Sequence, residues 1–436
     1  MRGYISHRSW CALVLTGLVL GLSIGCARPV GSDAERSPVT KIEAGPDAQK
    51  QALNALIDAK PGHTIEFGEG TFSFKSSLSC DVDNVTIRGA GQDKTILSFK
   101  EQGQGTGGEG LLVTSKKGFT IENLAVEDAK GDAIKVNGCD GVTFRGVRTS
   151  WSDGPKESNG SYGLYPVLSQ NVLIEDCIAT DASDAGIYVG QSENIIVRRN
   201  RAEHNVAGIE IENSVNADVY DNVATNNTGG ILVFSLPDLP KKIGHHCRVY
   251  DNKVFENNHP NFAPKGTAVA GVPAGTGVMI MANRHVEVFK NEIADNQNVN
   301  LSIVSYLSTG KPFDQDPGYD PFCEAIYIHD NTFSGGGDKP NGRLGELLKV
   351  LAGGEKLPDI VYDGVVNPEK AVDGKLPEEL AIRIQNNGDA DFMNFDLANL
   401  NIENPGESEK ANVSRDLAPY QGDLPKLSPV SIAGVK

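Results

Sequence analysis

One apolar pattern recurs along the chain from Val85 to Phe333 and restricts the folds that this sequence can adopt. In each full copy, two mainly apolar residues are separated by one residue. A step of three residues then leads to a second pair with the same separation. The clearest copy is Val172, Ile174, Cys177 and Ala179. The other copies begin at Val85, Phe119, Val142, Ile195, Ala217, Cys247, Val286 and Ile326. The shortest repeats span about 22 residues, the length of one supersecondary unit in a repeat protein.

Side chains alternate between the two faces of a β-strand, so Val172 and Ile174 point to one side and Leu173 to the other. The three-residue step predicts a bend between two strands. A third strand, introduced by glycine in most copies, closes each turn, as in Gly186-Ile187-Tyr188-Val189. We therefore predict an all-β fold, a single-stranded right-handed parallel β-helix whose longer repeats carry insertions.

Asparagine recurs at the bend in five copies, at Asn200, Asn222, Asn252, Asn291 and Asn331. In stacked turns these residues would form an internal ladder, each amide bonding to the turns above and below. Cys177 would occupy the same row as a small buried residue. Five cysteines follow the first 26 residues, an odd number without metal-like spacing, which predicts buried thiols rather than disulfides.

The first residues have the pattern of an export signal. Two arginines precede an apolar stretch from Trp10 to Gly25, and Leu22-Ser23-Ile24-Gly25-Cys26 resembles a bacterial lipobox, although serine replaces the usual leucine three residues before the cysteine. We expect residues 1–25 to be a lipoprotein signal peptide, Cys26 to be lipidated, and residues 26–45 to form a flexible tether; an ordinary signal peptide is the alternative. Ala27, not an aspartate, stands directly after Cys26. This favours lipid anchoring in the cell envelope at the outer membrane, facing the periplasm or the outside.

Both ends of a solenoid need a cover, because an end turn exposes its apolar interior and unpaired backbone groups. We expect the β-helix to span residues 46–337 and to begin with a capping helix in which Ala52, Leu53, Leu56 and Ile57 share one face. The repeat pattern stops at a run of three glycines that ends at residue 337, so residues 338–436 are expected to form an irregular C-terminal cap that wraps the last turn.

The formal net charge is −17 and becomes more negative without the signal segment, which contains two arginines and no acid. Such a surface argues against nucleic acid as a partner. An anionic glycan would need a local basic patch or a bridging cation. Calcium is a candidate cofactor because Asp and Asn crowd the turns, although turns favour both residues for backbone reasons alone.

The segment from Asp47 to Leu97, with Gly70-Thr71-Phe72 and Val85 to Gly91, resembles the opening of the pectate-lyase-like superfamily of parallel β-helices. Nearly the whole mature chain is similar to the exported parallel β-helix repeat lipoproteins, including Gly163 to Val167 and Ile382 to Asp396. This resemblance implies a second exported protein, encoded nearby, as a partner. It also implies polysaccharide lyases, uronan epimerases and glycosidases among the relatives, alongside non-catalytic members, so the function must be argued from a site.

Most enzyme signatures of these relatives are missing. The Asp-Pro-His-Asp tetrad of mannuronan epimerases does not occur, and neither does the adjacent aspartate pair of polygalacturonase-type hydrolases. Gly131-Asp132-Ala133-Ile134 keeps a single acid at the corresponding place, which disfavours inverting hydrolysis.

The insertions indicate where a site could lie. Residues 150–162 and 255–276 leave the repeat at the same corner and are predicted to form two walls, while 234–246 and 304–324 leave at the opposite corner. The outer face of the third strand would then be the floor of a groove. The outward residues of successive turns are Lys135, Tyr165, Tyr188, Glu210, Leu232 and Met279. Aromatic faces beside a carboxylate and an ammonium group suit a sugar chain, although tyrosines also stack on sheets simply because aromatic residues favour strands.

We predict that chemistry at this groove, if present, is β-elimination from, or epimerisation of, a uronic acid chain. The candidate catalytic residues are Lys135, Tyr165, Tyr188, His204 and Glu210. Lys135, or a cation held by Asp184, would neutralise the substrate carboxylate, and His204 or a tyrosine of lowered pKa would remove the proton on C5. The candidate substrate-binding residues are Trp151, Asp153, Asp184 and Leu232. A solvated turn residue is the alternative for His204, and the adjacent His245 and His246 should point apart, so no metal site is predicted.

Three functions remain open. The first is a lipoprotein that binds or modifies a polysaccharide. The second is a non-catalytic scaffold that docks another exported protein, for which an acidic exterior and long insertions would serve equally well. The third is a module that delivers a metal or cofactor, which no Met, Cys or His cluster in the sequence supports.

Overall fold

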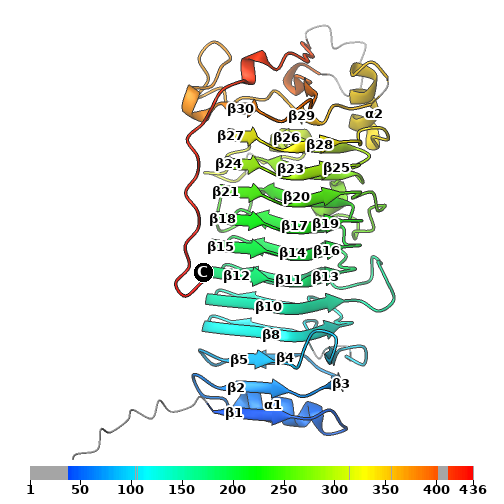
Figure 1. The fold of residues 1–436 in the computed structure, drawn as a ribbon, viewed down its shortest axis with the longest axis vertical. Coiled ribbons are helices and arrows are strands. Elements are labelled where there is room, and N and C mark those ends of the chain that lie inside the picture. Colours follow the sequence, from blue (N-terminus) through cyan, green and yellow to red (C-terminus); the bar gives the residue numbers. More distant parts are fainter. Residues whose placement is uncertain are drawn as a thin grey trace, which may run out of the picture. The chain divides into compact units, whose positions relative to one another are not determined.

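The computed structural model describes residues 38–103, 105, 107–313, 315–354, 356–400 and 411–435, with all side chains except those of Arg343 and Leu344. The predicted signal peptide, Cys26 and the first part of the tether lie outside this range. Within it, the strands stack as successive turns of a right-handed parallel β-helix (Figure 1), which confirms the predicted fold. No helix in the described part of the chain is long and apolar enough to cross a membrane.

Two parallel sheets run along the stack, with 20 strands and 11 strands among the described residues. A representative turn consists of β12 (Gln170–Glu175) and β13 (Ile178–Thr180) in the larger sheet and β14 (Ala185–Gly190) in the smaller one. The next turn repeats this arrangement one strand away, so that Val172 pairs with Ile195 and Ile187 pairs with Ile209. Apolar residues of one parity along each strand therefore face a common core.

The first strands of the turns are β2 (Thr64–Phe67), β5 (Thr86–Arg88), β8 (Lys117–Glu127), β10 (Asp140–Ser150), β12, β15 (Glu193–Arg198), β18 (Val215–Tyr220), β21 (His245–Tyr250), β24 (Arg284–Phe289), β27 (Glu324–His329) and β30 (Ile382–Gln385). The second strands are β3 (Gly70–Ser73), β6 (Thr95–Ser98), β13, β16 (Arg201–Glu203), β19 (Val223–Thr225), β22 (Lys253–Phe255), β25 (Glu292–Ala294) and β28 (Thr332–Ser334). The third strands are β4 (Leu78–Cys80), β7 (Leu111–Thr114), β9 (Ile134–Asn137), β11 (Tyr162–Val167), β14, β17 (Ala207–Glu212), β20 (Gly229–Phe234), β23 (Thr276–Met281), β26 (Val299–Val304), β29 (Ile360–Tyr362) and β31 (Phe392–Asn394).

The predicted asparagine ladder is present. Asn222 Oδ1 accepts hydrogen bonds of 3.0 Å from both the backbone N–H and the side-chain amide of Asn200. The Asn222 amide in turn donates to Val197 O and Asn252 Oδ1. The backbone N–H of Cys177 donates to Asn200 Oδ1, which confirms that Cys177 occupies the same row. The ladder therefore satisfies buried polar groups at the bend of each turn.

A second ladder, which we did not predict, follows the corner between the second and third strands. Asn205, Asn227 and Asn257 bond to one another there, and the row ends at Asn296 and Asn300. Except at Asn300, the residue before each of these ladder asparagines has a left-handed backbone, such as Asp221 with a φ of 54° and Asn226 with a φ of 55°. Asn and Asp tolerate this conformation better than most residues, which explains their abundance at the corners.

The ends of the β-helix differ in part from expectation. Helix α1 (Ala48–Asp58) covers the first turn with Ala52 and Leu56, but Ile57 is 77% exposed because the buried face centres on Ala48, Ala52 and Ala55. Strand β1 (Val39–Ile42), in the predicted tether, pairs with β2. Beyond residue 337, helix α2 (Gly342–Leu351) is followed by β29, β30 and β31, which continue both sheets. The sheets thus extend past the predicted end, because insertions separate these last strands and hide the repeat.

The last described residues form a strap, residues 421–435, along the outer face of the larger sheet (Figure 1, red). Asp423 accepts hydrogen bonds from Tyr327 and Gln385. Farther along, the backbone N–H of Leu427 donates to Glu287, and that of Val430 donates to Asp218. Ile432 packs against Leu173 and Ile196. The strap therefore contacts turns from β30 to β12.

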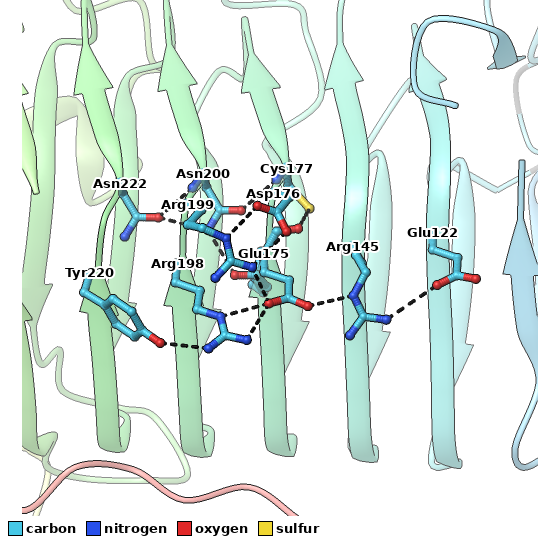
Figure 2. A network of polar contacts seen from close by, with 11 residues as sticks. Glu122, Arg145, Glu175, Asp176, Cys177, Arg198, Arg199, Asn200, Tyr220 and Asn222 are labelled. Atoms are coloured by element: carbon cyan, nitrogen blue, oxygen red, sulfur yellow. Dashed lines mark hydrogen bonds and ion pairs between the residues drawn. The ribbon is translucent and has the colours of Figure 1, made fainter. Parts of the chain in front are cut away.

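An ion-pair network also crosses this sheet (Figure 2). Glu175 lies at its centre and accepts hydrogen bonds from Arg145 at 2.6 Å, Arg198 at 2.8 Å and Arg199 at 2.7 Å. Although burial raises the pKa of Glu175, these guanidinium groups outweigh it and lower the pKa to about 2. The network ties β10, β12 and β15 together through side chains. The five cysteines of the described residues are free and buried, as predicted.

Candidate functional site

The outward row of the third-strand sheet is arranged as predicted. Lys135 pairs with Tyr165 across β9 and β11, and Tyr188, Glu210 and Leu232 pair across β14, β17 and β20. Neighbouring strands in a sheet are about 4.8 Å apart, so side chains of one row lie in contact from turn to turn. This row is the geometric frame of the candidate site.

Three tyrosine rings form a cluster at the first turns of this row. The ring centroids of Tyr165 and Tyr188 are 4.9 Å apart, and Tyr162 lies 4.4 Å from Tyr165 and 4.6 Å from Tyr188. The ammonium group of Lys135 lies 4.9 Å from the centroid of the Tyr165 ring, in cation–π contact. Gly190 leaves room for the Tyr188 ring, since a Cβ there would lie 2.5 Å from Cζ of Tyr188.

Carboxyl groups surround these rings. Tyr162 donates a 3.4 Å hydrogen bond to Asp184, and the hydroxyl of Tyr188 donates to Glu212. Lys135 lies 3.5 Å from Asp132 and 3.9 Å from Glu109. Acids from four of five successive turns thus share one patch with the ammonium group of Lys135.

Burial makes these acids weaker than usual. It raises the pKa of Asp132 to about 6, although the positive charge of Lys135 opposes the shift. Burial and the Asp184 carboxylate together raise the pKa of Glu212 to about 8. The pKa values of Asp184 and Glu210 are raised for the same reason, each by burial first and by a neighbouring acid second. Near neutral pH the patch therefore holds both protonated and ionised carboxyl groups.

The same environment changes the roles expected of the tyrosines. Burial, followed by the nearby Asp132 carboxylate, raises the pKa of Tyr165 to about 12, and burial and Asp184 raise the pKa of Tyr162. The prediction that Tyr165 has a lowered pKa and acts as a base is therefore wrong. Desolvation and neighbouring negative charge both oppose formation of a phenolate. A carboxylate of raised pKa is the better base here.

The floor of the predicted groove is partly covered. Glu210 is 2% exposed, Leu232 is 1% exposed and Tyr188 is 4% exposed. Apolar residues of the insertions, including Phe262 and Val269, pack over this part of the row and form a second hydrophobic core. The expectation of an open floor at Glu210 and Leu232 is wrong because the insertions fold inward over the sheet. Tyr162 and Tyr165 remain half-buried at its edge.

The predicted wall at residues 150–162 is also different. Trp151 is 5% exposed, packs in the main core and donates a 2.7 Å hydrogen bond from Nε1 to Ala129 O. The prediction that Trp151 contacts the substrate is therefore wrong. Asp153 is exposed and pairs with Lys156 at 3.1 Å and with Lys100 at 4.0 Å. The wall thus presents a charged surface rather than an aromatic one.

His204 lies exposed at the corner before Asn205, with a φ of 59°. Asn226 occupies the equivalent position one turn later, also with a left-handed backbone. This placement agrees with a turn residue, and the observed contacts of the tyrosine cluster do not include His204.

Two further expectations concern metals. In the described residues, no group of three or more His, Cys, Asp or Glu side chains is arranged to hold a metal ion. The prediction that His245 and His246 point apart is wrong, because their Nδ1 atoms lie 2.7 Å from each other. The left-handed backbone of His246, with a φ of 60°, breaks the strand alternation on which that prediction depended.

Sequence reasoning missed Tyr162 and Glu212 as site residues. Glu212 follows Glu210 by two residues on the same strand, so period-2 alternation could have found it. Tyr162 has the parity of the inward Leu164, but it stands where the insertion enters β11, and its ring lies beside Tyr165. No pattern in the sequence predicts that displacement.

Comparisons with known proteins agree with the fold. The family model described as the right handed beta helix region matches residues 71–238. A polygalacturonase from Penicillium griseoroseum is 22% identical over 285 residues, covering 58% of this chain and 73% of that protein. The A-module of mannuronan C-5 epimerase AlgE4 from Azotobacter vinelandii aligns with a TM-score of 0.51 and 16% identity, covering 74% of this chain and 89% of that one.

An alginate lyase from Paenibacillus sp. str. FPU-7 aligns with a TM-score of 0.45 and 16% identity, covering 70% of this chain and 99% of that one. The named neighbours are β-helix enzymes that act on polysaccharides, whereas identities this low establish the architecture alone. The repeat, the two parallel sheets and these comparisons together identify the fold as a right-handed parallel β-helix.

Proposed function

We propose that this protein binds an acidic polysaccharide on the outer face of the third-strand sheet, at β9 and β11, and modifies it by acid–base chemistry. The observation that carries this proposal is the patch in which Asp132, Asp184 and Glu212, all with raised pKa values, surround tyrosine rings and Lys135. Perturbed carboxyl groups with specific charged partners are typical of catalytic sites. The polysaccharide-active neighbours support the same class of ligand.

The chemistry assigns distinct roles to the groups in this patch. Elimination or epimerisation of a uronic acid needs a positive group near the substrate carboxylate and a base near the proton on C5. Lys135 provides the positive group, and Asp132, with its pKa raised to about 6, provides a base matched to mildly acidic or neutral pH. Glu212, with a pKa of about 8, stays protonated near neutral pH and can donate a proton. The half-buried ring of Tyr165 offers a face on which a sugar can stack.

Binding tests the first part of this proposal. The chain from residue 27 onwards would be titrated with acidic and neutral polysaccharides, with and without calcium. We expect saturable binding of an acidic glycan, weakened about tenfold or more in Lys135→Ala, because a charge-assisted hydrogen bond contributes about 1.5–3 kcal/mol. Lys253→Ala is the matched control, since Lys253 is an exposed lysine of the larger sheet. Absence of glycan binding would redirect the search to a protein partner.

Catalysis is tested separately. Elimination creates a double bond that absorbs ultraviolet light, and epimerisation in heavy water introduces deuterium at C5, which proton NMR detects. We expect either signal to be lost in Asp132→Asn and kept in Asp58→Asn, because Asp58 is exposed on helix α1 and is not part of the patch. Equal activity of both variants would exclude Asp132 as the base.

The cellular location is part of the same proposal. We expect Cys26 to carry a lipid and to anchor the protein in the cell envelope, facing a polysaccharide of the periplasm or the surface. Labelling of growing cells with a radioactive fatty acid would test this expectation. Wild-type protein should incorporate the label, and Cys26→Ser should not.

A further inference from the structure

A separate cavity lies on the same sheet, several turns beyond the tyrosine cluster. Its volume is about 390 Å³. Met279, Ser302 and Val361 line it from successive strands β23, β26 and β29, at paired positions of one row. Val272 and Pro273 of one insertion, Ser308, Thr309 and Lys311 of the next, and Leu348 of helix α2 line other sides. The covered residues Glu210 and Leu232 separate this cavity from the tyrosine cluster.

Eleven of the 21 described lining residues of the cavity are apolar. The apolar residues that surround the floor are Val272, Met281, Val304, Leu348, Leu357 and Phe395. Phe395 is the one aromatic side chain among the described lining residues, and the two methionines can adapt their shape to an irregular apolar ligand. Together these side chains form an apolar surface that an alkyl chain can cover.

The polar part of the described lining consists of Thr276, Asn298, Ser302, Ser308, Thr309, Asn341 and one charged residue, Lys311. Lys311 is exposed at the cavity and has no ion pair among the described residues. None of the described lining residues is acidic, although the chain as a whole has a net charge of −17. The hydroxyl of Ser302, a residue that is 8% exposed, also has no hydrogen-bond partner in the described part of the structure. A negative group near Lys311, with a hydroxyl donor at the floor, would complete the site.

We propose that this cavity binds an aliphatic carboxylate of the medium-chain fatty acid class. The alkyl chain contacts apolar side chains of the lining, including Leu348 and Leu357, and the carboxylate lies toward Lys311. The volume falls within the range of about 300–1,000 Å³ that is usual for small-molecule sites. This site is independent of the proposed glycan site, since the two share no residue.

Binding of decanoate to the chain from residue 27 onwards, measured by isothermal titration calorimetry, tests the proposal. We expect saturable binding at one site per chain. Lys311→Met should weaken it about two- to fivefold, which is the effect expected for an exposed ion pair. Lys265→Met is the matched control, because Lys265 is an exposed lysine of the neighbouring insertion that does not line the cavity. Decyltrimethylammonium, with the same chain and a positive head group, should bind at least tenfold more weakly.

A second experiment fills the cavity with a large side chain. Ser302→Trp and Met279→Trp should each abolish decanoate binding, and circular dichroism would show which variant keeps the β-helix. Glycan binding at Lys135 should persist in these variants, which separates failure of this proposal from failure of the proposed function. No decanoate binding to the wild type, equal binding by a folded Trp variant, or equal binding of the cationic amphiphile would overturn the proposal.

Discussion

Replacement of Asn222 by alanine should reveal how much the asparagine ladder stabilises the β-helix. The substitution removes four hydrogen bonds of 2.9–3.0 Å and leaves the backbone N–H of Asn200 without its acceptor. Asn200 is 2% exposed, so water cannot replace the lost partner. An orphaned buried donor costs about 1–3 kcal/mol, and each of the other bonds contributes about 0.5–1.5 kcal/mol. We therefore expect the free energy of unfolding to fall by about 3–6 kcal/mol.

Equilibrium unfolding in urea, followed by circular dichroism and extrapolated linearly to water, measures this loss. Asn54→Ala is the control, because Asn54 is exposed on α1 and the change should stay within about 0.5 kcal/mol. Asn222→Asp keeps an acceptor for Asn200 but loses the amide donors, so it separates the two halves of the effect. A loss below about 1 kcal/mol in Asn222→Ala would refute the view that the ladder is a major source of stability.

The remaining predictions concern charge and the strap. The folded-state pKa values of Asp132 and Glu212 are raised to about 6 and about 8, above the values of about 4 in an unfolded chain, so their contribution to stability is fully present below about pH 4 and is lost as the pH rises through 6 to 8. The melting temperature should fall as the pH rises across this range, and it should fall less in the double variant Asp132→Asn with Glu212→Gln. An unchanged dependence of the melting temperature on pH in that variant would contradict these pKa values. Glu175→Gln should lower the free energy of unfolding by about 2 kcal/mol. This is less than the roughly 3–5 kcal/mol of a fully buried pair, because Arg145 and Arg199 are partly exposed. Urea unfolding measures the loss, and an unchanged midpoint would count against a stabilising role of the network. Ile432→Ser should release the end of the strap and speed its cleavage by a protease about tenfold or more, because burial of an isoleucine contributes about 1.5–3 kcal/mol; cleavage at the wild-type rate would show that Ile432 does not hold the strap.

The fold could be predicted because its constraints are local and repeated. Every turn must place small or apolar residues at the same inward positions, so Val172, Ile174 and Cys177 have counterparts in each copy. The ladder residue Asn222 repeats for the same reason. These patterns are visible without knowledge of any long-range contact.

The candidate site could be predicted only in part. The row of Lys135, Tyr165 and Tyr188 follows from strand parity and is present. The cover over Leu232 could not be predicted, because a few apolar contacts made by Phe262 and Val269 decide how the insertions fold. The pKa values likewise depend on burial, which tertiary packing creates. The sequence therefore shows which residues share a face, whereas tertiary packing decides which of them meet solvent.

The strap has a consequence for cooperativity. In most solenoid proteins each repeat contacts only its neighbours, so turns can open one at a time. Here Leu427 bonds to Glu287 and Val430 bonds to Asp218, which are distant in sequence and lie on different turns. Fraying of a single turn beneath the strap must therefore also break contacts that belong to other turns. The strap couples the turns between β12 and β30 into one longer cooperative unit, in which hydrogen exchange of their core amides should report a common opening free energy.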